Sequence, residues 1–272
     1  MLRNFPIIIL IVLLLNTAFA QKLPTRNLEY KEKIEQLMRA QDMQGTIVVY
    51  DASNNIYYSN DFALAEKGNL PASTFKIVNT IIALETQVLT DENTIMRWDG
   101  KKRRFDFWEK DMTVREAFHA SCLPCYQEVA RKIGVKRMRT YLKKLQYPHM
   151  EVDENTIDNF WIKGPSRISP LEQILFLQRF YSRQLPISAQ TYDKMISIFE
   201  KEKNDNYRYF GKTGWSDDNN WNNGWFVGIV DKGEKVYYFA LNVEPIDQAN
   251  TSKFTAGREW VTREVLKLLQ IH

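Results

Sequence analysis

Histidine is scarce in this chain of 272 residues, and its scarcity argues against several kinds of active site. The three histidines are His119, His149 and the terminal His272, and they form neither an H-E-x-x-H nor an H-x-H motif. A zinc enzyme is therefore not expected, because a histidine-bound metal needs such clusters. The chain also has no G-x-S-x-G sequence, which argues against a serine–histidine hydrolase. His119 stands two residues before Ser121, and we interpret it as a structural residue.

The sequence also lacks a strong excess of charge of one sign. Lysine and arginine number 37 against 33 aspartates and glutamates, which leaves a formal net charge of +4. The densest basic run, KKRR at 101–104, stands beside acidic residues, and we interpret it as a solvated loop. Nucleic-acid binding would require a basic stripe with interleaved aromatics on one face, and the sequence offers none. With 44% hydrophobic residues and no repeats, the composition indicates a globular protein with a large core.

Long apolar runs are confined to the N-terminus. Residues 6–15 are apolar throughout, follow the single charge of Arg3 and precede the sequence A-F-A at 18–20. This run is too short to span a bilayer, which takes about 20 residues, but it is typical of a secretory signal with an A-x-A cleavage site. We predict a signal peptide over residues 1–20 and an exported, soluble protein, periplasmic or secreted, with no membrane association after cleavage. An uncleaved anchor is the alternative.

Cysteine occurs only twice, as Cys122 and Cys125 in the sequence SCLPCY. Export to an oxidising compartment would allow a disulfide, whereas a redox C-x-x-C would require a βαβ pattern that is missing here. A structural disulfide and two free buried thiols both remain open. Because cysteines three residues apart inside a regular helix bridge with difficulty, we slightly favour free thiols.

Apolar periodicity predicts strands near both ends of the mature chain and helices between them. The expected elements are a helix at 28–41, a hairpin at 45–59, helices between about 71 and 184 (one at 171–181), strands from about 207 with a turn at 231–234, and a helix at 255–269. This order favours an α+β fold, an α/β/α sandwich in which terminal helices flank an antiparallel sheet and a helical lobe is inserted. We expect one domain over 21–272, with the sheet lobe at about 21–66 and 185–272 and the helical lobe at about 67–184.

A serine and a lysine three residues apart open a strongly apolar run. Ser73 and Lys76 in STFK lie at a predicted helix start, where residues at this spacing are surface neighbours. Apolar surroundings lower the pKa of a lysine, which can then act as a base and activate the serine. The same residues also fit a helix cap and a lysine that reaches the surface, so the motif leaves both interpretations open.

A second motif, K-T-G at 212–214, stands near the end of a predicted strand. Lys212 would place a positive charge near the nucleophile, and the hydroxyl of Thr213 would bind a substrate carboxylate. Gly214 would let an extended substrate approach the strand backbone. The N–H groups of Trp215 and Ser73 would form an oxyanion hole, in which one donor is typically worth about 10²–10³ in rate. A strand end and turn is the structural alternative for K-T-G alone.

S-x-x-K followed by K-T-G is the signature of penicillin-recognising serine enzymes. Over nearly its whole mature length, the sequence resembles the class D serine β-lactamases of the oxacillinase type. The stretches that carry this resemblance are STFK at 73–76, SCLPCYQEVAR at 121–131, IDNFWIKGPSRISPLEQ at 157–173, KTGW at 212–215, and Arg258 in TAGREW. Class A β-lactamases fit less well, because S-D-N is missing.

The resemblance implies a β-lactamase/transpeptidase-like fold, and hydrolysis of β-lactam antibiotics through an acyl-serine at Ser73. It implies that Lys76 reacts with carbon dioxide to form a carbamate, which serves as general base and accepts a hydrogen bond from Trp161. Ser121 would relay protons to the leaving nitrogen, and Arg258 would bind the substrate carboxylate. No metal and no cofactor other than carbon dioxide is implied, and the expected assembly is a monomer or homodimer.

Three departures from the family pattern affect the expected substrate range and turnover. Tyr147-Pro148-His149 stands where relatives carry Tyr-Gly-Asn, so this loop is expected to differ in shape. Ser166 replaces a usual leucine, which would loosen the cover over Lys76. Cys122 and Leu123 vary the family's S-x-V segment.

Two other functions use the same residues. A cell-wall transpeptidase or carboxypeptidase would act on peptides, but the chain is short for that class and carries the tryptophan loop of the lactamases. A β-lactam sensor would be acylated and not released. Multiple turnovers of a chromogenic cephalosporin would distinguish a lactamase from both.

Overall fold

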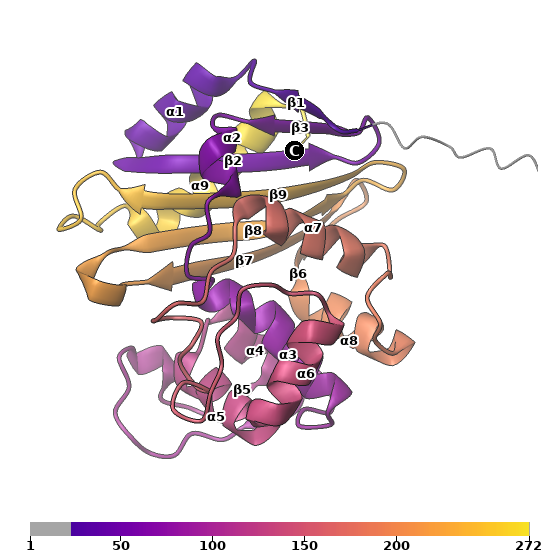
Figure 1. The fold of residues 1–272 in the computed structure, drawn as a ribbon, viewed down its shortest axis with the longest axis vertical. Helices are drawn as coiled ribbons and strands as arrows, with labels where there is room; N and C mark the ends of the chain where they lie inside the picture. The colour runs from indigo at the N-terminus through magenta and orange to yellow at the C-terminus, as the bar shows by residue number, and fades with distance from the viewer. Residues whose placement is uncertain (1–22, 272) are drawn as a thin grey trace, which may run out of the picture.

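The computed structural model describes residues 23–271, and a seven-stranded sheet lies at its centre (Figure 1). The strand order is β1-β3-β2-β9-β8-β7-β6. The strands are β1 (Thr25–Asn27), β2 (Met43–Asp51), β3 (Ile56–Ser59), β6 (Glu200–Lys203), β7 (Arg208–Ser216), β8 (Asn223–Asp231) and β9 (Val236–Pro245). All neighbours are antiparallel except β1 and β3, which run parallel. The predicted antiparallel sheet is therefore confirmed apart from its first strand. The predicted signal peptide lies outside the described residues.

The central strands are buried on both faces, because each face carries its own hydrophobic core. In β8, Trp225 and Val227 belong to one core cluster, whereas Phe226 and Val230 belong to the other. This alternation follows from the two-residue period of a strand. Since both faces are covered, the sequence of β8 is almost continuously apolar.

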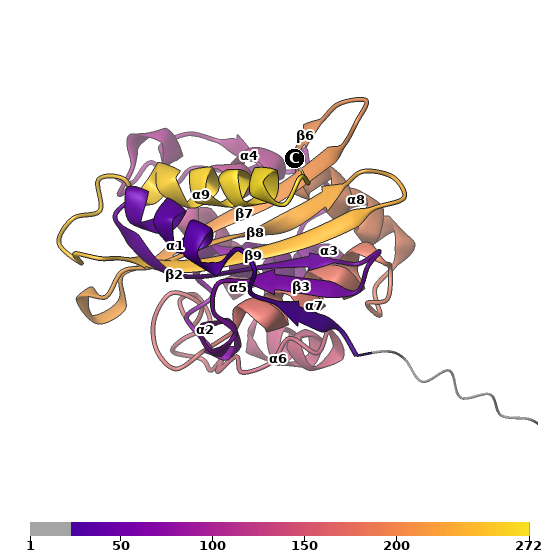
Figure 2. The same cartoon turned by 90° about the horizontal axis from the view of Figure 1, so that it is seen from above.

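The helices near the two ends of the chain flank the sheet, as predicted, and together they cover one of its faces (Figure 2). They are α1 (Lys31–Ala40) and α9 (Phe254–Leu268), and they contact each other. Ile34 of α1 and Val261 of α9 are buried in the core cluster of this face. Within residues 23–271, no helix combines the length and the apolar character needed to cross a membrane.

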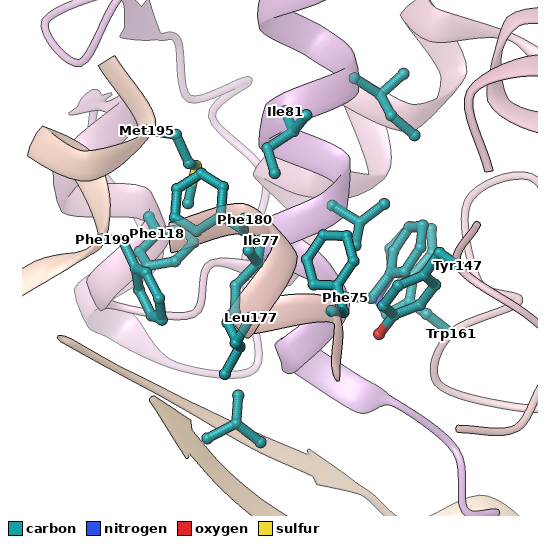
Figure 3. Packing of buried hydrophobic residues seen from close by; sticks show 14 of the residues in the cluster. Phe75, Ile77, Ile81, Phe118, Tyr147, Trp161, Leu177, Phe180, Met195 and Phe199 are labelled. Atoms are coloured by element: carbon teal, nitrogen blue, oxygen red, sulfur yellow. The ribbon is translucent and has the colours of Figure 1, made fainter. Parts of the chain in front are cut away.

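The opposite face of the sheet carries α7 (Pro170–Tyr181) and the helical lobe, which surrounds α3 (Lys76–Glu85). Every residue of α3 except Glu85 is buried, and Ile77 and Ile81 point into the aromatic core (Figure 3). The other helices on this side are α2 (Phe62–Glu66), α4 (Val114–His119), α5 (Leu123–Ile133), α6 (Val135–Lys144) and α8 (Ala189–Phe199). Short 3-10 turns are η1 (Ala72–Phe75), η2 (Asp106–Trp108) and η3 (Asp218–Asn220), and β4 (Ile95–Met96) pairs with β5 (Met112–Thr113).

Two helices pack differently from the lobe boundaries expected from the sequence. Helix α7 falls in the segment assigned to the helical lobe, yet it packs against β9 and β2. Helix α8 falls in the segment assigned to the sheet lobe, yet it contacts α3 and α4. Leu177 and Phe180 of α7 belong to the same core cluster as Ile77 (Figure 3), so this helix joins the sheet to the core around α3.

Candidate active site

Ser73 lies in the 3-10 turn η1, directly before α3 begins at Lys76. The sequence predicted that Ser73 would stand at a helix start, and the structure places one 3-10 turn and then the α-helix there. Ala72 adopts a left-handed φ of +50°, and its N–H donates to the Trp161 carbonyl at 2.7 Å. This bond ties the serine-bearing turn to the loop that carries Trp161.

The amine of Lys76 contacts Ser73, as the S-x-x-K spacing predicted. Its Nζ donates to the Ser73 Oγ at 2.8 Å, and the lysine is only 1% exposed. Burial lowers the pKa of Lys76 to about 7, because the ammonium form loses its hydration there. A lysine with this pKa can release and accept a proton near neutral pH, which a general base for Ser73 requires.

Ser121 and Lys212 form a second hydroxyl–amine pair in the site. Ser121 lies in the corner between α4 and α5 with a φ of +52°, and its Oγ accepts a short hydrogen bond from Lys212 Nζ. Lys212 comes from β7 and also donates to the Thr213 carbonyl at 3.0 Å. A residue pair 91 positions apart in the chain is therefore brought together by the packing of the helical lobe on β7.

The charge that the sequence assigned to Lys212 is easily lost. The lysine is 2% exposed, and burial is the main cause that lowers its pKa well below the ordinary value. The positive charges of Lys76 and Arg258 lower this pKa further. Lys212 is therefore suited to donate a proton to Ser121, and it is not restricted to a fixed electrostatic role.

Gly214 lets β7 lie directly against the turn that carries the serine. A Cβ atom at this position would come within 3.2 Å of the Pro71 carbonyl oxygen, Thr74 Cγ2 and Trp225 Cβ. Residues 211–216 of β7 pair with β8 on one edge, and in the described chain no strand pairs with them on the other. This free edge could accept an extended substrate, as the sequence predicted for Gly214.

Arg258 reaches the site from α9 and lies beside Gly214 and Trp215. Its Nη1 donates to the Gly214 carbonyl, its Nε donates to the Phe254 carbonyl at 2.8 Å, and it is 3% exposed. Burial lowers the pKa of Arg258 to about 10, so the guanidinium remains charged at neutral pH. Sequence reasoning missed Gly224, where a Cβ would lie 2.8 Å from Arg258 Cδ. This glycine in β8 makes room for the arginine.

Trp161 is fully buried, and its ring stacks on Phe75 with centroids 5.6 Å apart (Figure 3). Its backbone carbonyl holds Ala72, as described above, but its indole Nε1 finds no hydrogen-bond partner among residues 23–271. Buried donors are rarely left unpaired, because the lost hydration costs free energy. Trp161 therefore offers a hydrogen bond to an acceptor that the described part of the chain does not supply.

Eight of the nine predicted site residues gather at one cleft of about 360 Å³, whereas Trp161 does not line it and is buried against Phe75. Six of them line it, namely Ser73, Ser121, Thr213, Gly214, Trp215 and Arg258. Lys76 and Lys212 are buried behind the two serines to which they are hydrogen-bonded. A polar cavity of about 390 Å³, lined by Asn60, Asn223 and Asn242 among others, contains none of the predicted residues, so the chemistry points to the smaller cleft.

The mouth of the cleft is formed by residues that the sequence did not indicate. Phe105, Phe107 and Trp108 form an aromatic wall, and Phe107 is 55% exposed. Arg104 Nη1 pairs with Asp217 Oδ2 at 3.3 Å, and both residues line the cleft. The last arginine of KKRR therefore belongs to the site, and the only sequence signal was the aromatic density that follows this run.

His119, and the residues at positions where the sequence departs from the family pattern, lie in structural surroundings. Burial, followed by the charge of Lys212, lowers the pKa of His119 to about 4, so its imidazole is neutral. The Ser166 hydroxyl is buried and accepts from the Glu151 N–H at 3.0 Å. It thus ties the loop to itself, a role that leucine could not perform. Tyr147 is buried beside Phe75 (Figure 3).

Cys122 and Cys125 form a disulfide, so the slight preference for free thiols was wrong. That preference assumed that both residues lie inside a regular helix. Cys122 is instead the N-cap of α5, with φ −53° and ψ 102°, and its non-helical backbone allows the Cα atoms to approach to 5.4 Å.

Comparison with known proteins agrees with this site. A family model described as the penicillin-binding protein transpeptidase domain matches residues 40–266. The chain is 36% identical over 246 residues to β-lactamase OXA-10 of Pseudomonas aeruginosa, which covers 89% of this chain and 90% of that protein. The crystal structure of the class D β-lactamase YbXI from Nostoc has a TM-score of 0.83 at 38% identity, covering 88% of this chain and 99% of that one.

A more distant structure shares the fold. The C-terminal domain of the Bacillus licheniformis BlaR penicillin receptor has a TM-score of 0.83 at 23% identity, covering 93% of this chain and 98% of that domain, and this likeness bears on the fold alone. The relatives named above 30% identity match 88–89% of this chain. The S-x-x-K and K-T-G signature of penicillin-recognising serine enzymes contributes Ser73, Thr213 and Gly214 to the lining of one cleft. The chain belongs to the class D β-lactamases, within the wider family of penicillin-binding transpeptidase domains.

Proposed function

We propose that this protein hydrolyses β-lactam antibiotics through an acyl-enzyme on Ser73 and thereby confers β-lactam resistance. The observation that carries the proposal is the contact of 2.8 Å between Ser73 Oγ and a buried lysine whose pKa is lowered to about 7. A serine hydroxyl is a weak nucleophile until a nearby base takes its proton, and Lys76 is placed to do so.

In the acylation step, the basic group at Lys76 takes the hydroxyl proton while Ser73 Oγ bonds to the lactam carbonyl carbon. The carbon–nitrogen bond of the lactam then breaks, and the nitrogen takes a proton from Ser121. Lys212 replaces that proton through its hydrogen bond to Ser121 Oγ. The buried guanidinium of Arg258, together with Thr213, binds the carboxylate of the substrate at the floor of the cleft.

We further propose that carbon dioxide binds covalently to the Lys76 amine as a carbamate. The residues present fit this group. Lys76 is neutral for much of the time near pH 7, its surroundings are apolar, and the unpaired Nε1 of Trp161 would hydrogen-bond an added oxygen. When bound, the carbamate supplies an anionic oxygen base for the hydrolysis of the acyl-enzyme. Trp161 would orient that oxygen and exclude water from its ring side.

The test is turnover by purified protein together with intact-mass measurement. We expect many turnovers of a chromogenic cephalosporin per molecule, and a penicillin adduct that Ser73→Ala lacks. Thr90→Ala, which changes an exposed residue that does not line the cleft, serves as the control and should behave as the natural protein. A single stoichiometric burst would favour a sensor or a slow transpeptidase, and an adduct on Ser73→Ala would mean that another serine is the nucleophile.

We also propose that the protein is exported after cleavage before Gln21. The motif of Arg3, the apolar run at 6–15 and A-F-A at 18–20 supports this. The exported protein should begin at Gln21 by N-terminal sequencing. A chain that starts at Met1 and stays with the membrane fraction would instead indicate an uncleaved anchor.

A further inference from the structure

We propose that the disulfide between Cys122 and Cys125 positions Ser121 for proton transfer, so that the oxidised enzyme is the fully active form. This inference rests on the proposed β-lactamase function. Cys122 directly follows Ser121 in the chain, and its disulfide to Cys125 closes a ring at the first turn of α5.

Ser121 has a backbone conformation that its surroundings must maintain. Its φ of +52° lies in the left-handed region, which is unfavourable for a residue with a Cβ. Its N–H donates to the Phe118 carbonyl at 3.2 Å, and the preceding carbonyl of Ala120 accepts from Trp108 Nε1 at 3.0 Å. These bonds fix the chain on the α4 side of Ser121.

The disulfide fixes the chain on the other side. Cys122 is non-helical and donates its N–H to the Ala117 carbonyl at 2.9 Å, while its Sγ accepts from the Cys125 N–H at 3.3 Å. The covalent bond to Cys125 prevents Cys122 from rotating into helical geometry and extending α5 backwards. Ser121 is therefore held between two anchored segments.

Release of this anchor would act on the hydrogen bond between Ser121 and Lys212. If Ser121 relaxes towards an ordinary φ, its Oγ moves away from the amine. The other acceptor that the described residues give Lys212 Nζ is its neighbour's carbonyl, Thr213 O. A buried amine that loses one of its two acceptors is harder to protonate, so the relay to the leaving nitrogen slows.

The disulfide borders a small pocket that adjoins the catalytic cleft. Cys122 is 1% exposed, whereas Cys125 is partly exposed and lines a pocket of about 20 Å³ with Arg97, Arg103 and Glu128. Trp108 lines both this pocket and the catalytic cleft, so the two sites are in direct contact.

The experiment compares the oxidised protein with protein reduced by dithiothreitol, which gives two electrons and two protons to the disulfide and becomes its own cyclic disulfide. We expect kcat for a chromogenic cephalosporin to fall about 10- to 100-fold, the effect of misplacing a proton-transfer group. Substrate binding before acylation should change little, because Arg258 is untouched. Reoxidation should restore kcat.

Three variants separate the disulfide from other effects of the reductant. Cys125→Ala and Cys122→Ser both lack the disulfide but keep a capping atom at residue 122, and both should resemble the reduced enzyme and ignore dithiothreitol. Glu128→Gln, on the same helix, should keep the disulfide and its sensitivity to reduction. Thiol counting establishes the state of each sample.

The outcomes distinguish this inference from the proposed function. Equal kcat in oxidised protein, reduced protein and Cys125→Ala would overturn the positioning role and leave the function intact. A loss of activity that accompanies global unfolding by circular dichroism would also overturn it, because the disulfide would then be a general stabiliser. An oxidised protein that hydrolyses no β-lactam would overturn the proposed function itself.

Discussion

Mild acid is expected to remove most of the turnover, because it protonates Lys76. With a pKa of about 7, the neutral fraction of this amine is about 0.9 at pH 8 and about 0.1 at pH 6. Any step that needs the neutral amine should therefore slow by about tenfold. With the ordinary lysine value of 10.5, less than about 1% of the amine would be neutral even at pH 8.

The dependence on carbon dioxide follows from the same equilibrium. A carbamate forms reversibly and only from the neutral amine, so degassing and acid should act in the same direction. We expect initial rates with a chromogenic cephalosporin to fall in degassed buffer at pH 6.5 and to recover when bicarbonate is added at constant pH. Carbon NMR with labelled bicarbonate should show a carbamate signal that Lys76→Ala lacks, a readout that does not depend on activity.

The opposite result would refute the carbamate. Full turnover in rigorously degassed buffer, without a bicarbonate response or a carbamate signal, would refute the carbamate and leave Lys76 as an ordinary amine base. A control with Lys232→Ala, at an exposed lysine in the β8–β9 turn, should keep both the signal and the response.

Four further predictions follow from the same contacts. Lys76→Met should be inactive yet more stable at pH 7 by up to about 3–5 kcal/mol in chemical denaturation, because lowering the lysine pKa from 10.5 to about 7 costs the folded state about 1.4 kcal/mol per pKa unit. This gain in stability should shrink as the pH rises from 7 to 10.5, because in that range the unfolded natural chain binds a proton on Lys76 that the folded chain has lost. Equal stability of the two proteins would contradict the burial argument. Trp161→Phe keeps the ring stack but removes the unpaired N–H donor. It should therefore need about tenfold more bicarbonate for half-maximal activity, which corresponds to the loss of one hydrogen bond to a charged group. An unchanged bicarbonate requirement would exclude Trp161 as the hydrogen-bond donor to the carbamate. Arg258→Ala should lower kcat/KM about 10²-fold for β-lactams that carry a carboxylate and far less for their esters, and an equal loss for both would indicate a structural role. Gly214→Val should lower kcat/KM by pushing β7 away from the serine turn, and a variant with normal kinetics would show that this close approach is dispensable.

The catalytic pairs were predictable where the chemistry is local in the sequence. Ser73 and Lys76 are three residues apart, and helical spacing alone brings their side chains together. Lys212 was indicated by K-T-G, but its contact with Ser121 depends on how the helical lobe packs on β7. Arg258 was found only through the family resemblance, because an arginine in an amphipathic helix is unremarkable by composition.

The features of the site that the sequence did not predict depend on contacts between segments distant in the chain or on the backbone conformation of one residue. Gly224 matters because Arg258 passes over it, and nothing near Gly224 in the sequence indicates an arginine. The ion pair between Arg104 and Asp217 joins loops 113 positions apart. For Cys122, the error came from assuming a regular helix, whereas Pro124 and the N-cap geometry start the helix one residue later.

The charges of the site indicate what kind of ligand it accepts. Lys76, Lys212 and Arg258 are all buried, and within residues 23–271 no carboxylate forms an ion pair with any of them. Buried cations without counter-charges are costly, and here the two lysines respond with lowered pKa values. An anionic ligand relieves this cost. Both anions of the proposed mechanism would relieve this cost. A substrate carboxylate would pair with Arg258. A carbamate would remove the positive charge of Lys76 and place a negative charge near Lys212. The two should therefore stabilise each other's binding, and a carboxylate-bearing inhibitor should lower the bicarbonate concentration at which the carbamate signal appears.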